Sequence, residues 1–141
     1  MAATTALKVT GINHVVLHVT DLERSKKFYM DLLGFEDRNI SAGPTMRASF
    51  LRCGIQGLDL FEVSTADVHG GEEMNHMALS VDIDNIDQAV EVLAQCGIET
   101  SDPTPRNTVF ISDPDGHRIE VLPRSASERA LEHQAAQGSG A

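Results

Sequence analysis

Histidine and acidic residues recur at matching positions in the two halves of the sequence. The segment INHVVLHV, which begins at residue 12, is echoed 62 residues later by MNHMALSV. A second echo matches LDLF, which contains Asp59, with IEVL, which contains Glu120. Imidazole and carboxylate groups together suit a divalent ion of the first transition row. The repeat therefore predicts a metal site to which each half contributes one histidine and one acid: His14, Asp59, His76 and Glu120.

The alternation of side chains along a strand predicts which of these residues share a face. His14, Val16 and His18 are two residues apart, so they point to one side of a strand, while the aliphatic residues between them point to the other. We expect the aliphatic side to face the helices, which leaves the histidines in a concave cleft. The same alternation turns Asp59 and Glu120 inward.

One helix pattern and several strand patterns follow the first strand of each half. Both helix patterns end at a glycine, as helices commonly do. In the first half we expect a helix over 21–33 and strands over 36–40, 47–52 and 58–63; in the second half, a helix over 85–96 and strands over 99–101, 108–112 and 118–122. The predicted N-terminal caps are Thr20 with Glu23, and Asp84 with Asp87.

Each half is therefore predicted to fold as a βαβββ module. We expect a single α+β domain in which two tandem modules form curved mixed sheets around a metal-containing cleft. The modules cover about residues 12–64 and 74–123, with a linker over 65–73 and a tail or short helix over 124–141. Glu62 has the wrong alternation for the cleft, so we expect it to face solvent or to form a surface ion pair.

The composition argues against several classes of protein. The 141 residues include 11 Lys and Arg against 21 Asp and Glu, a net charge of −10 that repels nucleic acid. No apolar run approaches the roughly 20 residues that cross a bilayer, so we expect no membrane role. Two cysteines are too few for a disulfide scaffold, and no secretory signal is recognised, so the expected location is cytoplasmic.

The run DPDGHRIE at 113–120, the two Asn-His segments and the Gly-Phe pair at 34–35 resemble the vicinal oxygen chelate superfamily. This superfamily includes glyoxalase I, extradiol dioxygenases, methylmalonyl-CoA epimerase, fosfomycin-resistance transferases and bleomycin-binding proteins. The resemblance covers about residues 12–123. It implies paired βαβββ modules, a divalent metal (Ni, Co, Zn, Mn or Fe) and a small substrate that chelates the metal through oxygens.

The resemblance also assigns roles to individual residues. His14, His76 and Glu120 match the three ligands that most metal-dependent members share. Asp59 matches the place of a fourth ligand, Glu or Gln, but it is one methylene shorter, so it would reach the metal directly or through water. In a glyoxalase-type lyase or isomerase, Glu120, with or without Asp59, would take a proton from carbon beside a carbonyl. His18 lies two residues after His14 on the same predicted face, so it is a further candidate acid or base, including for the protons of a catechol.

Other activities within the superfamily remain open. One is an Fe(II) extradiol ring-cleaving dioxygenase, although the single tyrosine, Tyr29, is expected in the core rather than beside a catechol. Another is a transferase or drug-binding protein of the fosfomycin- or bleomycin-resistance type. Val16 and Phe110 stand where fosfomycin transferases carry Thr and Tyr, which counts against that activity. A thiol cosubstrate is compatible with the glyoxalase-type interpretation.

A moderately apolar wall is predicted beside the metal, and such a surface suits a small organic substrate. Its predicted substrate contacts are Val16, Met46, Phe50, Phe61, Thr108, Phe110 and Arg118, the last as an anion contact. By analogy with the superfamily we expect a homodimer, with each site formed within one chain or across the dimer.

Overall fold

The structure is a computed structural model that describes residues 6, 12–70, 74–124 and 136–138. The chain divides into two compact units, residues 1–68 and 69–141. The division falls inside the predicted linker over 65–73. Most of the predicted C-terminal tail or helix, residues 125–135 and 139–141, lies outside the described residues.

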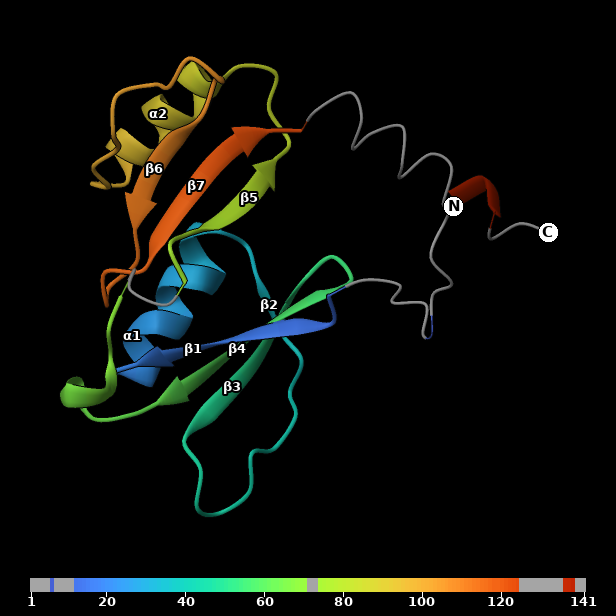
Figure 1. Cartoon of the computed structure of the whole chain (residues 1–141), viewed down its shortest axis with the longest axis vertical. Helices are drawn as coiled ribbons and strands as arrows, with labels where there is room; N and C mark the ends of the chain where they lie inside the picture. Colours follow the sequence, from blue (N-terminus) through green and yellow to red (C-terminus); the bar gives the residue numbers. More distant parts are fainter. Residues whose placement is uncertain (1–5, 7–11, 71–73, 125–135, 139–141) are drawn as a thin grey trace. The chain divides into compact units, whose positions relative to one another are not determined.

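The first unit is a four-stranded mixed sheet with one helical segment (Figure 1). Its elements are β1 (His14–Val19), α1 (Leu22–Lys27), the π-helical turn η1 (Phe28–Leu32), β2 (Glu36–Asp37), β3 (Ala48–Cys53), β4 (Gln56–Glu62) and the 3₁₀ turn η2 (Thr65–Asp67). The strand order is β1-β4-β3-β2, with β1 parallel to β4 and the other pairs antiparallel. The helix α1 contacts β3 and β4.

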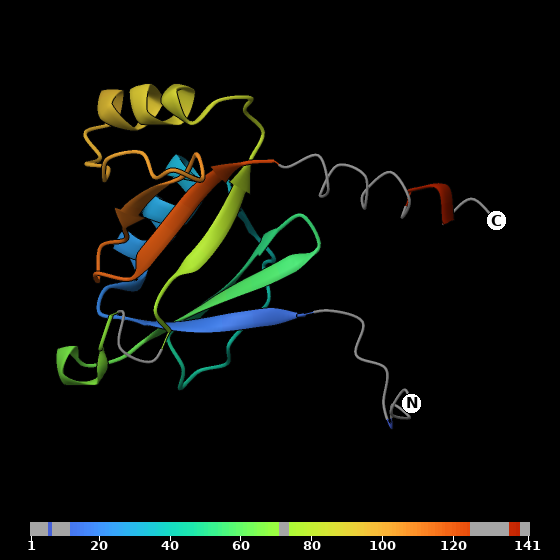
Figure 2. The ribbon, with the colours of Figure 1, turned by 45° about the horizontal axis from the view of Figure 1, so that its top comes forward.

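The second unit is a smaller mixed sheet covered by one helix. Its elements are β5 (Met77–Val81), α2 (Ile86–Gln95), β6 (Val109–Ser112) and β7 (Arg118–Pro123). The strand order is β5-β7-β6, with β5 parallel to β7 and β6 antiparallel to it. The helix α2 packs against β7, on one face of the sheet (Figure 2). The predicted α+β class with two mixed sheets is confirmed.

Two strand predictions differ from the structure. The predicted strand over 36–40 stops at Asp37, because Asn39 adopts a positive φ of 55° and donates its N–H to the Asp37 side chain at 2.7 Å. The predicted strand over 99–101 does not form. Ser101 donates its N–H to the carbonyl oxygen of Phe110 at 3.0 Å, but the Phe110 N–H bonds the Ser101 hydroxyl at 2.9 Å instead of a backbone carbonyl. One backbone bond does not make a ladder, so the second unit is βαββ.

Both predicted helix caps are also wrong by one residue. Asp21, not Thr20, caps α1 and accepts a hydrogen bond from the Arg24 N–H at 3.1 Å. Asn85, not Asp84, caps α2, and Gln88 completes a capping box by accepting from the Asn85 N–H at 3.1 Å. Asp21 and Asn85 both have the extended backbone that is typical of an N-cap residue.

The cores of the two units follow the alternation that the sequence predicts. Along β1, His14, Val16 and His18 are exposed, while Leu17 and Val19 are 3% and 0% exposed. In the second unit the apolar face of α2 meets aliphatic residues of the sheet. These buried residues are Ile86, Ala89, Leu93, Val109, Ile111, Ile119 and Val121. Within the described residues, no helix has the length and apolar character of a membrane span.

Candidate metal and active site

Each unit contains one histidine beside one carboxylate. In the first unit, His14 Nε2 lies 3.6 Å from Asp59 Oδ2; in the second, His76 Nε2 lies 3.1 Å from Glu120 Oε2. Each histidine immediately precedes or begins the first strand of its unit, and each acid lies on the parallel strand beside it. The two histidine–acid pairs thus have the same local construction.

The register of the strands shows that the two acids occupy equivalent positions. Asp59 is opposite Val16, the residue two positions after His14. Glu120 is opposite Ala78, the residue two positions after His76. Phe50 on β3 is opposite Asp59, and its counterpart on β6 is opposite Glu120. The echo in the sequence is therefore an equivalence in register, and it includes Asp59.

The carboxylates are buried and the imidazoles are accessible. The side chains of Asp59 and Glu120 are 7% and 11% exposed, against 45% and 36% for His14 and His76. Asp59 Oδ1 is buried and has no hydrogen-bond partner among the described residues. Leaving such an oxygen unpaired costs about 1–3 kcal/mol, and more when it is charged. A binding partner for this oxygen would remove that cost.

Within the described part of each unit, the structure brings two donors together. Among the residues that the structure describes, no group of three His, Cys, Asp or Glu side chains forms a metal-binding cluster. His14 with Asp59 and His76 with Glu120 are the two pairs that the structure brings together. The combination of both pairs into one four-ligand site stays a prediction.

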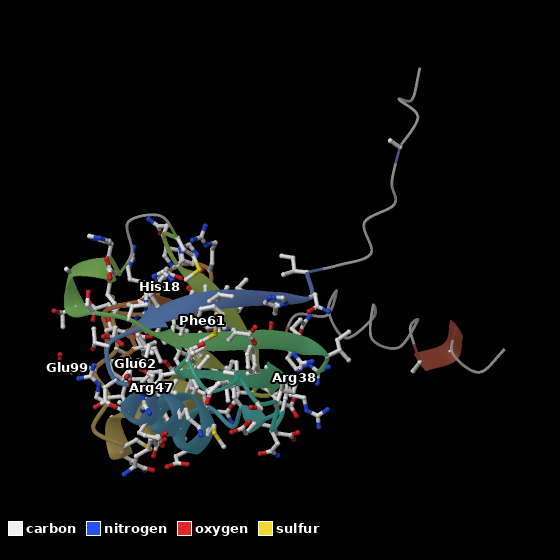
Figure 3. The ribbon with its side chains drawn as sticks, turned by 90° about the horizontal axis from the view of Figure 1, so that it is seen from below. His18, Arg38, Arg47, Phe61, Glu62 and Glu99 are labelled. Carbon is white, nitrogen blue, oxygen red and sulfur yellow. The ribbon has the colours of Figure 1, made fainter. Side chains whose placement is uncertain are left out.

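Aromatic rings flank both pairs. The His76 and Phe110 rings lie edge to face, with centroids 5.4 Å apart. In the first unit Phe50 and Phe61 make a similar contact at 6.4 Å, and Phe61 is the register partner of His18 on β1 (Figure 3). His18 and Phe61 thus lie on the strands that carry the first pair, whereas Phe50 and Phe110 lie on the neighbouring strands, opposite the two acids.

Arg118 begins β7 and contacts two residues, Phe110 and Asn75, that themselves contact His76. Its guanidinium carbon is 4.7 Å from the centroid of the Phe110 ring, a cation–π distance. One guanidinium nitrogen lies 3.5 Å from Asn75 Oδ1. Phe110 and Arg118 also line a shallow depression of about 440 Å³ beside β6.

The remaining predicted substrate contacts differ in their surroundings. Val16 and Met46 are 40% and 46% exposed, and Met46 lines an open depression of about 450 Å³ near the loop before β3. Thr108 is only 3% exposed, and its hydroxyl is 2.7 Å from the Thr104 hydroxyl. Contact of these three residues with substrate stays a prediction.

Asn13 and Asn75, which precede the two histidines, have no role in the prediction from the sequence. Asn13 Oδ1 lies 2.8 Å from His14 Nδ1, and Asn75 Oδ1 lies 2.8 Å from His76 Nδ1. Because the Asn-His dipeptide occurs in both halves, the sequence contains the pattern from which a shared role of the two asparagines could have been predicted.

Glu62 stabilises the fold on the side where the alternation places it. It accepts hydrogen bonds from the Leu22 N–H at 2.8 Å and from Arg47 Nε at 2.7 Å, and the side chains of Arg47 and Glu62 point toward one another in Figure 3. The Leu22 N–H and the Arg47 guanidinium hold the pKa of Glu62 below its ordinary value of about 4.5. The predicted surface ion pair is present, and the same carboxylate also receives the first N–H of α1.

Replacing Glu62 with glutamine is expected to lower the free energy of unfolding at neutral pH and to have a smaller effect in acid. The stability from ionised Glu62 is present above its unfolded pKa, and it disappears as the pH falls through the lower folded pKa. Urea unfolding of both proteins over a pH series measures this. Glu91→Gln, on the exposed side of α2, is the control. A deficit of the same size at every pH would contradict the assignment.

Gly57 lies where the second unit has Arg118, two residues before the acid. A Cβ atom at Gly57 would lie 2.7 Å from His14 Cβ, which is too close. Gly57→Ala is therefore expected to displace His14 and to cost about 1–3 kcal/mol of unfolding free energy. Denaturant unfolding measures the cost. An unchanged denaturant midpoint would contradict the prediction, because it would show that β1 shifts to accommodate the methyl group without loss of stability.

Comparison with known proteins gives the class to which this arrangement belongs. Residues 11–121 match the Glyoxalase/Bleomycin resistance protein/Dioxygenase superfamily. The chain belongs to this superfamily, so the resemblance found in the sequence is confirmed.

Individual relatives are more distant. The chain is 30% identical over 138 residues to a lactoylglutathione lyase of Escherichia coli O157:H7, covering 84% of this chain and 96% of that one. It is 26% identical to metallothiol transferase FosB of Staphylococcus epidermidis, covering 87% and 88%. A solved structure of the fosfomycin resistance protein FosX from Listeria monocytogenes, in complex with Mn(II), has a TM-score of 0.70 at 19% identity, covering 86% and 98%. That likeness shows a common fold.

Proposed function

We propose that this protein is a metal-dependent lyase or isomerase of the glyoxalase type, acting on a small substrate that chelates a divalent metal through oxygens. The observation that carries the proposal is the pair of histidine–carboxylate contacts in identical register. The similarity to lactoylglutathione lyases over most of both chains supports it.

The proposed ligands of the metal are His14, Asp59, His76 and Glu120, supplied by one chain or by two chains of a homodimer. The donor set fits a first-row divalent ion, because it contains two imidazoles and two carboxylates. The buried Asp59 Oδ1, which has no partner among the described residues, also fits a cation ligand. Two carboxylates neutralise a divalent ion, whereas one would leave a charge of +1 at the site.

A divalent ion bound there would stabilise negative charge that develops on a substrate oxygen. The residues of the chain would do the rest. The Glu120 carboxylate, with Asp59 at the equivalent position, would accept a proton from carbon beside a carbonyl and return it to the neighbouring carbon, which isomerises the substrate without a net change in protons. His18 would supply a further acid or base. Phe50, Phe61 and Phe110 would exclude water from the reacting atoms.

The structure weighs against a catechol dioxygenase. The single tyrosine, Tyr29, is 0% exposed and packs between the rings of Phe28 and Phe35, with centroids 5.1 and 5.5 Å away. It therefore cannot handle the protons of a bound catechol. A thiol transferase acting on a phosphonate antibiotic is the second candidate, favoured by the similarity to FosB.

Metal analysis and activity assays on the same full-length protein test the proposal. Protein purified without oxygen is stripped, reloaded with Ni(II), Co(II), Zn(II), Mn(II) or Fe(II), and assayed with a hemithioacetal of an α-ketoaldehyde. Parallel assays use fosfomycin with a thiol, and catechol with oxygen. Metal-dependent turnover of the hemithioacetal is the expected result. Turnover of fosfomycin or catechol alone, or stoichiometric drug binding by protein that takes up no metal, would overturn the proposal.

A further inference from the structure

We propose that Asn13 and Asn75 are positioning residues that hold His14 and His76 in the tautomer whose Nε2 lone pair faces the acid. The inference rests on the proposed metal site, because Nε2 is then the atom offered to the ion. Each asparagine directly precedes its histidine and contacts the ring nitrogen farther from the carboxylate.

The hydrogen-bond chemistry fixes the tautomer. An amide oxygen only accepts, so a contact of 2.8 Å between Asn75 Oδ1 and His76 Nδ1 requires the proton on Nδ1. In a neutral ring, Nε2 then carries a lone pair. The Nε2 atom that carries the lone pair lies 3.1 Å from Glu120 Oε2. Two electron-rich atoms at this distance repel one another unless a proton or a metal cation lies between them. The same arrangement recurs in the first unit at 3.6 Å.

Arg118 fixes which end of the Asn75 amide faces the ring. A guanidinium has only donors, so its approach to Asn75 at 3.5 Å is compatible with an oxygen there and not with an amide nitrogen. The Phe110 ring supports this approach, because it contacts both the guanidinium at 4.7 Å and the His76 ring at 5.4 Å. Arg118 thus orients Asn75, and Asn75 orients His76.

The first unit does not repeat this support. Gly57 stands at the position that matches Arg118 and supplies no guanidinium. We therefore expect the tautomer to be more strongly fixed at His76 than at His14. The shorter histidine–acid distance in the second unit agrees with this order.

Imidazole NMR on metal-free, full-length protein tests the inference without any activity. In buffer alkaline enough for neutral imidazole, long-range ¹H–¹⁵N correlations should show Nδ1–H for His14 and His76. In Asn75→Ala, the His76 signal should shift toward the Nε2–H form while the His14 signal stays unchanged. Asn75→Asp keeps the acceptor oxygen and should restore Nδ1–H. Arg118→Met should give a partial shift at His76.

Zn(II) titration against a competing chelator gives the second readout. Fixing the tautomer of a ligand histidine contributes about 10–100-fold in affinity, so Asn75→Ala should weaken Zn(II) binding by that factor and Asn75→Asp should restore it. Unchanged His76 tautomers in Asn75→Ala would overturn the inference, as would Nε2–H in the wild type. Should the wild type show the Nδ1–H pattern but bind no Zn(II), the proposed function would fail while the tautomer result would stand on its own. If Asn75→Ala fails to fold, the His76 tautomer is compared in the wild type, Asn75→Asp and Arg118→Met. Nδ1–H in the first two with a partial shift in Arg118→Met supports the inference, and an unchanged tautomer in Arg118→Met contradicts the role of Arg118.

Discussion

Replacing His76 with alanine is expected to weaken the binding of a divalent metal more than about 100-fold, because the loss of a ligand should exceed the 10–100-fold cost of losing its supporting hydrogen bond. The substitution removes the accessible partner of Glu120, whose carboxylate oxygen lies 3.1 Å from the ring nitrogen. Competition titration with Zn(II), followed by metal analysis of the isolated protein, measures the effect.

Glu62→Ala is the matched comparison for His76→Ala. Its carboxylate is on the face of β4 that receives the Leu22 N–H and the Arg47 side chain, so its removal should leave metal affinity nearly unchanged. If Glu62→Ala lowered the metal affinity and His76→Ala did not, the assignment of faces along the strands would be wrong.

Turnover should fall by about 10²–10⁴-fold when Glu120 is replaced by glutamine, which is the usual contribution of a positioned acid or base. Glutamine keeps the size of the side chain and removes the charge that accepts a proton. The measurement is kcat with the hemithioacetal at saturating metal, so that weaker metal binding does not mask the chemistry.

Asp59→Asn is the comparison for Glu120→Gln, and Glu91→Gln is the control for loss of a negative charge. Asp59 occupies the position in the first unit that is equivalent to Glu120, so the variant of these two that loses more turnover identifies the principal base. Glu91 lies on the exposed side of α2, and its change to glutamine should leave kcat as it is. Full kcat in Glu120→Gln at saturating metal would assign the proton transfer elsewhere.

The strand alternation and the repeat could be predicted from the sequence because both depend on local spacing. His14, Val16 and His18 are exposed, while Leu17 and Val19 between and after them are buried, as the alternation requires. The repeat also predicted that Asp59 and Glu120 are equivalent, and the register of the strands agrees.

Features that depend on particular hydrogen bonds were not predictable from spacing. The Ser101 hydroxyl accepts a hydrogen bond from the Phe110 N–H that a further strand would need, and the Asp21 side chain accepts the cap hydrogen bond from the Arg24 N–H. The turn over Phe28–Leu32 is π-helical where a regular helix was expected, and it buries Tyr29 completely. The roles of Asn13 and Asn75 required knowledge of which ring nitrogen each one meets.

The difference between Gly57 and Arg118 makes the two otherwise equivalent pairs chemically distinct. Gly57 and Arg118 each lie two residues before an acid, but Gly57 has no side chain and Arg118 carries a positive charge held against the Phe110 ring. A small molecule bound beside one pair would therefore meet surroundings unlike those beside the other. Such a difference gives the protein a physical means to bind an anionic molecule beside one pair in preference to the other.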